Sequence, residues 1–375
     1  LLGEVPKGIT VLKQPIKEPY KFANMFSKKK SQTISKGIIK EKNSQSVLEK
    51  IMLYIRGNFF IPDARKFWVK PSVNYLSKFI NNNEVDIVIT TGPPHSLHLI
   101  GMQLKKIVGV KWVADFRDPW TTIGYHKKLK LTKHSQSKHE KLEHQVLYSV
   151  DKIIVTSEST KKEFEQKTNK PVEVITNGYD YISLDKAELD TKFTLSHVGS
   201  LLSERNPKVL WQVLKELIEE NEEFKNAFQL NLVGSISEDV LNSIEKFIST
   251  DYINKVGYVS HNESIKYQRQ SQLLLLIEID SEETKSIVPG KLFEYMVSNR
   301  PIIAIGPNSS DIEHILRETN AGRYFDYSDF DLIKETILLH FKAFQKGELK
   351  SHAIGLQKYS RRELTKKLAN LISWE

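Results

Sequence analysis

The sequence contains no cysteine, and this absence removes several kinds of chemistry at once. Without thiols the chain has no disulfides, no thiolate nucleophile and no cysteine-ligated zinc or iron–sulfur site. Long apolar runs are also missing, because the longest one, Leu273–Ile277, has five residues where a membrane-spanning helix needs about 20. The first residues show no signal-peptide pattern, so we expect a cytoplasmic protein.

Motifs of several common enzyme classes are absent as well. None of the 17 glycines forms Gly-x-Gly, so the dinucleotide fingerprint is missing, and neither a P-loop nor a Gly-x-Ser-x-Gly elbow occurs. His139 and His144 lie about 140° apart around a predicted helix, so they do not converge on one metal ion. We therefore expect no metal and no cofactor, and we interpret this helix as a solvated basic surface.

The positive charge is concentrated in two stretches. The formal net charge is +9, and residues 1–50 alone hold eleven lysines and four glutamates. Residues 126–144 hold six lysines, four histidines and two glutamates. A solvated face explains such an excess, and so does an anionic membrane surface or ligand. Arginine is scarce in both stretches and regular aromatic residues are absent, which argues against a nucleic-acid binder.

Short apolar runs alternate with amphipathic stretches from residue 84 onward. The first half predicts strands at 85–90, 111–114, 153–155 and 172–175, with helices at 96–108, 128–149 and 158–168. The second half predicts strands at 193–198, 230–233, 256–259, 273–279, 301–305 and 323–325, with helices at 207–220, 237–248, from 262, 290–298 and 310–319. This alternation is typical of α/β folds, so we expect two Rossmann-like domains with parallel sheets.

We place the first domain at residues 1–188 and the second at 189–355, with a final helix, 356–375, that crosses back to the first. Residues 1–83 fit the pattern less well and predict one strand at 9–12 and helices at 46–56 and 64–80. Because no buried strand opens this region, we hypothesise that a further βα unit precedes Leu1 and that the first domain is truncated here.

The loops that follow strands carry the candidate site, because open α/β sheets bind ligands outside the carboxyl ends of their strands. Pro289 and Gly290 begin a helix, whose free N–H groups can bind an anion. Lys291 adds a positive charge for a diphosphate, and the Glu294 carboxylate can accept both hydroxyls of a ribose. A proline-initiated helix with a surface lysine is the alternative interpretation.

Three further loops follow strands. In the loop 199–208, Gly199 allows close backbone approach, and Arg205 and Lys208 can bind phosphate oxygens. The loop 306–311 caps the next helix and can line the same ligand pocket as the loop 199–208.

In the first half, Asp115, Arg117 and Asp118 leave the end of a buried strand, and His95 and His98 follow the neighbouring one. We expect these side chains to face the second half across a cleft. A structural Asp–Arg pair with a capped turn is the alternative.

Together these motifs resemble the GT-B glycosyltransferases of family 4, over about residues 84–375. The most specific part is Pro-Gly-Lys-Leu-Phe-Glu-Tyr at 289–295 with Asn-Arg-Pro-Ile-Ile-Ala at 299–304. Asp-Phe-Arg-Asp-Pro-Trp at 115–120 resembles the variant of members that build surface polysaccharides, and 359–364 resembles the family's last helix.

The resemblance implies transfer of a sugar from a nucleoside diphosphate sugar to a glycan or lipid-linked acceptor, with retention of configuration and without metal. We expect a cytoplasmic enzyme that is peripheral on the inner face of the membrane, because the two basic stretches can dock on anionic lipid. Asp118 is then the first candidate for the catalytic group, followed by Asp115 and His95, while Arg117 and His98 belong to the acceptor side. The donor-binding residues are Gly199, Ser200, Arg205, Pro289, Gly290, Lys291 and Glu294.

The sequence departs from the family pattern at two positions. Ser286 stands where the family often has a sugar-binding glutamate, and Ser200 stands where it often has an arginine, for which Lys291 is our candidate replacement. Two alternatives share the architecture: a nucleotide-sugar 2-epimerase, and a catalytically silent binding protein of a polysaccharide-assembly complex.

Overall fold

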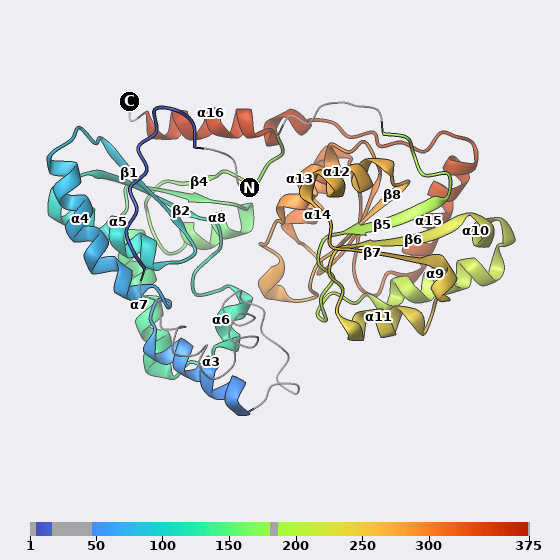
Figure 1. The fold of residues 1–375 in the computed structure, drawn as a ribbon, viewed down its shortest axis with the longest axis horizontal. Coiled ribbons are helices and arrows are strands. Elements are labelled where there is room, and N and C mark those ends of the chain that lie inside the picture. Colours follow the sequence, from blue (N-terminus) through green and yellow to red (C-terminus); the bar gives the residue numbers. More distant parts are fainter. Residues whose placement is uncertain (1–4, 17–46, 181–186, 374–375) are drawn as a thin grey trace. The chain divides into compact units, whose positions relative to one another are not determined.

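A computed structural model describes residues 5–16, 47–180 and 187–373. The chain forms two compact units: unit 1 contains Leu1–Val155 and Lys161–Glu173, and unit 2 contains Thr156–Thr160 and Val174–Glu375. Each unit holds one parallel β-sheet with helices packed against it (Figure 1). The predicted class, two Rossmann-like α/β domains, is confirmed.

Unit 1 contains a four-stranded sheet in the order β1-β2-β3-β4. Its strands are β1 (Ile87–Gly92), β2 (Lys111–Phe116), β3 (Lys152–Val155) and β4 (Val172–Val174). Its helices are α3 (Val47–Phe59), η2 (Lys66–Trp68), α4 (Val69–Asn81), α5 (Ser96–Val108), α6 (Gly124–Lys128), α7 (Lys133–Ser149) and α8 (Glu158–Glu165), the last of which begins in unit 2. The register of β1 on β2, with Thr91 opposite Asp115, brings the loops after these two strands together.

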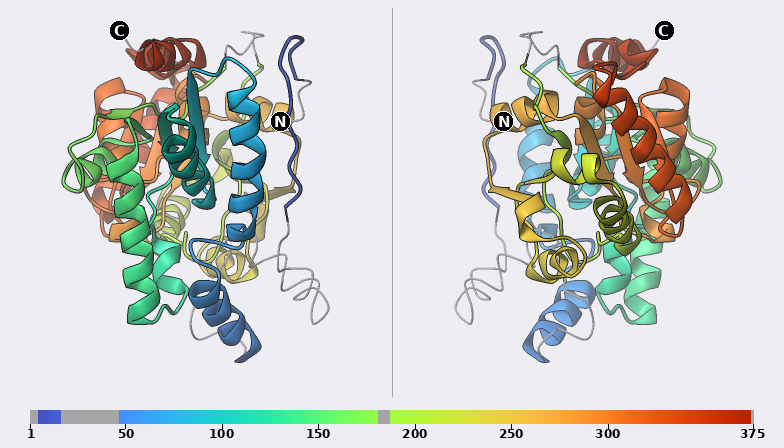
Figure 2. Two further views of the ribbon diagram at one scale, coloured as in Figure 1. Left: turned by 90° about the vertical axis from the view of Figure 1, so that its left-hand side faces the viewer. Right: turned by 90° about the vertical axis from the view of Figure 1, so that its right-hand side faces the viewer.

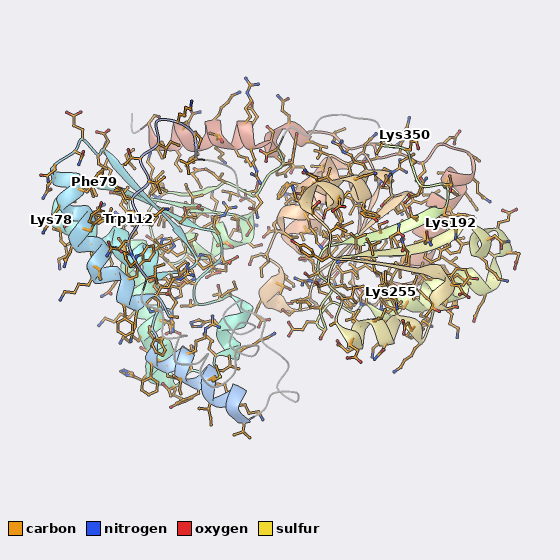
Figure 3. All side chains as sticks on the ribbon, in the orientation of Figure 1. Lys78, Phe79, Trp112, Lys192, Lys255 and Lys350 are labelled. Carbon is orange, nitrogen blue, oxygen red and sulfur yellow. The ribbon has the colours of Figure 1, made fainter. Side chains whose placement is uncertain are left out.

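Trp112 is one of the largest side chains in the interior of unit 1 and is fully buried, whereas Lys78 on α4 lies on its outside (Figure 3). The indole N–H donates to Thr90 Oγ1 at 2.9 Å, so the one polar atom of the ring is satisfied. A Cβ atom on Gly101 of α5 would lie 2.2 Å from this nitrogen. Glycine is therefore needed at this position for α5 to pack on the sheet.

Two sequence-based predictions for unit 1 are wrong. The single helix expected at 128–149 is divided, because Lys130 adopts a φ of +52° and Thr132 caps α7 by accepting a hydrogen bond from Ser135 N. The strand expected at 9–12 is absent, since residues 5–16 contain neither helix nor strand. Ile9 and Val11 are more than half exposed, so their β-branched side chains find no sheet to pack on.

Unit 2 contains a six-stranded sheet in the order β10-β9-β8-β5-β6-β7, in which every pairing is parallel. The strands are β5 (Phe193–Val198), β6 (Phe228–Val233), β7 (Ile253–Gly257), β8 (Leu273–Ile277), β9 (Ile302–Ile305) and β10 (Gly322–Phe325). β6 and β7 extend the sheet to one side of β5, and β8, β9 and β10 extend it to the other. This is the strand order of a doubly wound nucleotide-binding fold.

The sheet of unit 2 separates two hydrophobic cores. Leu273, Leu275 and Ile277 of β8 belong to one core, and Leu274 and Leu276 belong to the other, as the alternation of a strand requires. The first core is covered by α9 (Lys208–Glu220), α10 (Glu222–Ala227), α11 (Glu238–Glu245) and α15 (Phe330–Gln345). The second is covered by α12 (His261–Gln270), α13 (Gly290–Met296), α14 (Asp311–Thr319) and η5 (Leu356–Tyr359) (Figure 2).

The last helix, α16 (Arg361–Ile372), follows η5 and begins at Ser360, whose hydroxyl accepts from Glu363 N. Tyr179 forms a β-bridge with Ser360, which ties the start of α16 to the chain that enters unit 2. Among the described residues, no helix combines the length and the apolar character that crossing a membrane requires.

Candidate functional site

The strand order of unit 2 indicates where a ligand binds. β5 and β8 are neighbours in the middle of the sheet, and the chain leaves their carboxyl ends toward opposite sides. Open α/β sheets bind ligands at such a switch point. The first residues beyond the two strands are Gly199 and Glu278.

Gly199 allows the side chain of Lys291 to approach the end of β5. Its φ is +124°, which other residues rarely adopt, and a Cβ atom there would lie 3.2 Å from Lys291 Nζ. Its N–H donates to Val233 O at 2.7 Å. The role of Gly199 in donor binding stays a prediction, and the adjacent Ser200 is exposed.

Lys291, in the first turn of α13, lies against the end of β5. Its Nζ is 3.3 Å from Val198 O and 3.4 Å from His197 Nε2. His197 Nδ1 lies 3.1 Å from Leu275 O, and because a carbonyl only accepts, we assign the proton to Nδ1 and leave Nε2 as an acceptor for Lys291. Burial, and to a smaller extent the charge of Arg205, lower the pKa of Lys291 to about 7.

Arg205 lies close enough to this edge of the sheet to act on several groups. Its charge contributes to the lowered pKa of Lys291 and of His197, where burial is the larger cause. Two cations close to each other form a local positive potential, which a dianion such as a diphosphate relieves. Lys208, the other cation expected in this loop, is exposed at the start of α9.

Pro289 and Gly290 begin α13 as predicted, but this helix ends at Met296 and has seven residues. A Cβ atom on Gly290 would meet nothing within 4 Å, so this turn is open. Because a short helix has a small dipole, anion binding here depends mainly on the side-chain cations Lys291 and Arg205.

Glu294 lies one turn further along α13. Its Oε1 is 2.8 Å from His261 Nε2, and its Oε2 accepts from Gln268 Nε2 at 3.1 Å. Both partners belong to α12, so the carboxylate is oriented from one side. A ribose diol bound by Glu294 would share or replace these two hydrogen bonds, which the sequence did not indicate.

Glu278 is a residue of this edge that the sequence analysis missed. Its carboxylate accepts from Ser310 Oγ at 3.0 Å and from the Tyr324 hydroxyl. Burial raises the pKa of Glu278 to about 7 against the effect of these hydrogen bonds. A Cβ atom on Gly306 would lie 2.6 Å from Glu278 Oε2. Glu278 therefore holds the loop 306–310 in place. Its one sequence signal is a carboxylate directly after an apolar strand.

In unit 1, the loop after β2 gathers the predicted carboxylates. Asp115 Oδ1 lies 3.7 Å from Arg117 Nη1, and burial raises the pKa of Asp115 while Arg117 opposes the rise. Burial also raises the pKa of Asp118, again opposed by Arg117. The Arg117 N–H donates to Gly92 O at 2.9 Å, which connects this loop to the end of β1. Asp115, Arg117 and Asp118 thus lie together, and their catalytic roles stay a prediction.

The two predicted histidines of unit 1 are both buried. His95 stacks on Trp120 with ring centroids 4.8 Å apart, and neither of its ring nitrogens has a hydrogen-bond partner among the described residues. His98 has no exposed surface, packs on Phe116 at 4.1 Å between centroids and pairs with Thr90 Oγ1. His98 is thus part of the interior of unit 1, and its role on the acceptor side stays a prediction.

Helix α7 is not the fully solvated surface that the sequence predicts. His139 and Glu143, four residues apart on one face, are 1% and 3% exposed. His139 Nδ1 accepts from the indole N–H of Trp120 at 3.2 Å. Burial lowers the pKa of His139 to about 4 and that of His98 to about 3. Both imidazoles are thus neutral parts of the core of unit 1.

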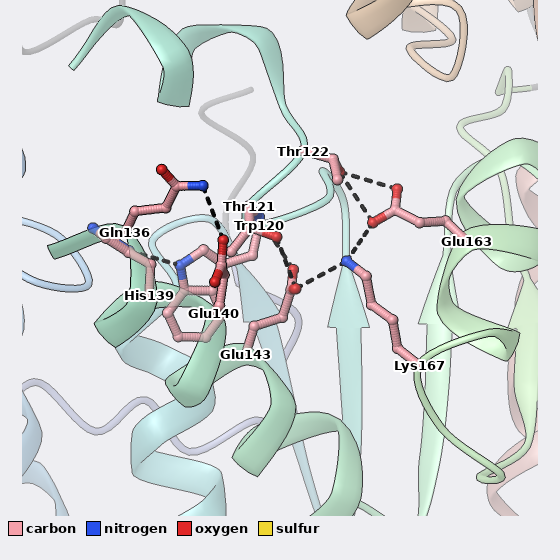
Figure 4. Close-up of polar contacts among 9 residues, drawn as sticks. All are labelled: Trp120, Thr121, Thr122, Gln136, His139, Glu140, Glu143, Glu163 and Lys167. Carbon is pink, nitrogen blue, oxygen red and sulfur yellow. Dashed lines mark hydrogen bonds and ion pairs between the residues drawn. The ribbon is translucent and has the colours of Figure 1, made fainter. Parts of the chain in front are cut away.

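Glu143 anchors the segment that follows Asp118 (Figure 4). Its carboxylate accepts from Thr121 N at 3.1 Å, from Thr121 Oγ1 at 2.8 Å and from Lys167 Nζ at 2.9 Å. Glu163 accepts from Lys167 and from Thr122 Oγ1 at 3.0 Å. Burial acts to lower the pKa of Lys167, but the two carboxylates together raise it. This network holds the loop that carries the candidate acidic residues.

Within the described ranges, no cluster of three or more histidine or carboxylate side chains is arranged to hold a metal ion. Whether the reaction proceeds without metal stays a prediction.

Comparison with solved structures shows that the fold is that of the GT-B glycosyltransferases. The glycosyltransferase from Rickettsia africae ESF-5 matches with a TM-score of 0.57 and 13% identity, over 91% of this chain and 86% of that one. Anabaena Alr3699/HepE, in complex with UDP and glucose, matches with 0.56 and 14%, over 81% and 82%. TarM of S. aureus matches with 0.55 and 16% over 80% of this chain, which spans 57% of TarM.

Residues 41–181 match the family model described as Glycosyltransferase Family 4, which confirms the predicted resemblance. No curated protein sequence matches the chain significantly. A protein described as a UDP-N-acetylglucosamine 2-epimerase of Listeria monocytogenes also shares the fold, with a TM-score of 0.50 and 12% identity over 81% of this chain and 78% of that one.

Proposed function

We propose that the protein is a glycosyltransferase that moves a sugar from a nucleoside diphosphate sugar to a glycan or lipid-linked acceptor in cell-surface polysaccharide synthesis. The observation that carries this proposal is the group of Arg205, Lys291 and Glu294 at the switch point of unit 2. It offers two cations for a diphosphate and one carboxylate for a ribose. The UDP and glucose in the Anabaena Alr3699/HepE structure support a UDP-sugar as the first donor to test.

In the proposed mechanism, bond breaking leaves negative charge on the departing diphosphate. Lys291 and Arg205 stabilise this charge, and they are already positioned, so little reorganisation accompanies the reaction. Asp118, or else Asp115 or His95, acts on the acceptor side, and Arg117 opposes the rise in pKa that burial causes in both aspartates. We propose retention of configuration and no requirement for metal, as in the family that the chain resembles.

We place the enzyme in the cytoplasm, on the inner face of the membrane, where a lipid-linked acceptor is found. The basic residues of 126–144 support this location by their charge.

Titration with UDP tests the donor site. Glu294→Ala and Arg205→Ala should each weaken UDP binding about tenfold or more, since each removes a charge-assisted contact. Lys192→Ala, an exposed residue of unit 2 (Figure 3), serves as the matched control and should bind UDP as the parent does. Unchanged UDP affinity in both site variants, with intact thermal unfolding, would remove the assignment.

The shared fold of the Listeria protein makes 2-epimerisation the second candidate. An epimerase forms product from the nucleotide sugar alone, whereas a transferase needs an acceptor, so incubation without acceptor distinguishes them. The third candidate is a silent binding protein of a polysaccharide-assembly complex, with which Ser200 and Ser286 at positions of expected charge are consistent. Such a protein would form no product from the nucleotide sugar, with or without an acceptor.

A further inference from the structure

Helix α3 exposes a row of apolar side chains along one face. Val47, Ile51, Ile55 and Phe59 recur at every fourth position, a spacing that places them on the same side of a helix. Their exposed fractions are 74%, 49%, 42% and 62%, and Phe67 in the nearby η2 is 54% exposed. We call these five residues the α3 face. Neighbouring exposed apolar side chains of this kind mark an interaction surface.

The opposite side of α3 is held firmly to unit 1. Leu53 is buried against Leu129, and a Cβ atom on Gly57 would lie 2.6 Å from Leu129 O. Asn58 donates to Lys130 O at 3.1 Å and accepts from Thr132 N at 2.8 Å. Helix α3 therefore lies on the segment between α6 and α7 (Figure 1). The α3 face is on a fixed element, and the second basic stretch of the sequence lies beside it.

Lysine side chains gather at the Phe59 end of this face. Lys66 Nζ donates to Phe59 O and lies 5.0 Å from the centroid of the Phe67 ring. Burial lowers the pKa of Lys66, and the charge of Lys138 on α7 lowers it further, so the two ammonium groups are near each other. Lys138 itself is exposed. An apolar row with lysines beside it thus faces outward.

We propose that the α3 face, with Lys66 and Lys138 beside it, docks on an anionic lipid bilayer. An interfacial helix buries its apolar side among the acyl chains while lysines meet the lipid phosphates, and both features are present here. A second copy of the chain would instead bring two sets of like charges together, which favours the bilayer as the occupant. This inference rests on the membrane location proposed above and names the surface that would dock, whereas UDP binding in unit 2 does not depend on it.

Vesicle flotation with the full chain tests this docking. The parent protein should bind vesicles of phosphatidylcholine mixed with phosphatidylglycerol, bind phosphatidylcholine alone much less, and lose binding as salt rises. The double variant Ile51→Gln/Phe59→Gln should lower the partition coefficient roughly tenfold or more, because two half-exposed apolar side chains no longer enter the bilayer. Lys138→Gln should lower binding to the anionic vesicles about fivefold.

The matched control is Leu332→Gln/Leu339→Gln on α15, whose side chains are 53% and 56% exposed, and it should bind vesicles as the parent does. Thermal unfolding and UDP titration of each variant check folding. If Ile51→Gln/Phe59→Gln does not fold, the proposal is tested by the dependence of vesicle binding on salt and on lipid charge, and by the binding of Lys138→Gln.

Equal binding to both vesicle types, or undiminished binding by the folded double variant, would overturn the proposal. The proposal would also be overturned if the parent formed a dimer in solution and did not bind vesicles, while the double variant was a monomer. Loss of UDP binding in every protein would count against the proposed function and leave the vesicle result standing.

Discussion

UDP affinity should fall as the pH rises above 7, because Lys291 attracts a diphosphate only in its protonated form. The pKa of Lys291 is lowered to about 7 in the free protein, and a bound anion favours the charged form and raises it. Binding is therefore coupled to proton uptake. Each pH unit above 7 should lower the affinity by up to about tenfold, or about 1.4 kcal/mol.

Glu278 acts in the same direction, since its pKa is also about 7 and its carboxylate becomes negative over this range. Burial lowers the pKa of His197, so this imidazole stays neutral above pH 7 and does not contribute. Replacing Lys291 with arginine keeps the charge at every pH, and replacing Glu278 with glutamine removes the other titration. The double variant Lys291→Arg/Glu278→Gln should therefore bind UDP with little dependence on pH.

Isothermal titration with UDP between about pH 7 and 9 measures this effect, because the phosphate itself titrates near pH 6 and is constant in this window. Buffers of different ionisation enthalpy report the protons taken up. Lys192→Arg is the surface control and should follow the parent. A parent affinity that is constant across this range, without proton uptake, would refute the role given to Lys291.

Three further predictions concern stability. The pKa values of His98 and His139 are lowered to about 3 and about 4, so both side chains stay neutral in the folded protein at pH values where they are protonated in the unfolded chain. The free energy of unfolding of unit 1 should therefore be highest above the unfolded-state pKa near 6.5 and about 4 kcal/mol lower at pH 5. Urea unfolding above pH 6.5 and at pH 5 measures the difference. Glu143→Leu should destabilise unit 1 by about 3 kcal/mol because Lys167 and Thr121 lose their buried acceptor, while the more exposed Glu163→Gln should have a smaller effect in the same urea assay. Gly306→Ala should lower the melting temperature, since its Cβ would lie 2.3 Å from the Tyr324 hydroxyl oxygen, whereas Gly290→Ala, with open space around it, should not.

The fold is largely predictable from the sequence because its signals are local. The apolar spacing of residues 96–108 predicts α5 at its observed bounds, and the run at 273–277 predicts a buried strand. The prediction of a strand at 9–12 is wrong because a strand depends on a partner elsewhere in the chain, not on local signals alone. A strand needs a neighbouring strand for its hydrogen bonds, and β-branched composition does not report whether one is present.

The site is predictable only in part, because its members come from separate segments. Gly199, Arg205 and Lys291 are visible as loop residues that follow strands, and the parallel sheet brings the ends of those strands together. Glu143 has no local pattern that reveals it, and the one signal for Glu278 is its place directly after an apolar strand. Their burial results from partners distant in the sequence, Tyr324 for Glu278 and Lys167 for Glu143.

The apolar run of β8 leaves the register of this strand to be fixed by the residues at its two ends. Five leucine and isoleucine residues in succession are nearly interchangeable, so a slip by one position would still place an aliphatic side chain in each core. Polar residues at the two ends resist such a slip. At one end Gln272 N donates to Thr194 Oγ1, and at the other Glu278 accepts from Tyr324. The position of Glu278 along the strand is thus set jointly with that of Gln272, about 20 Å away.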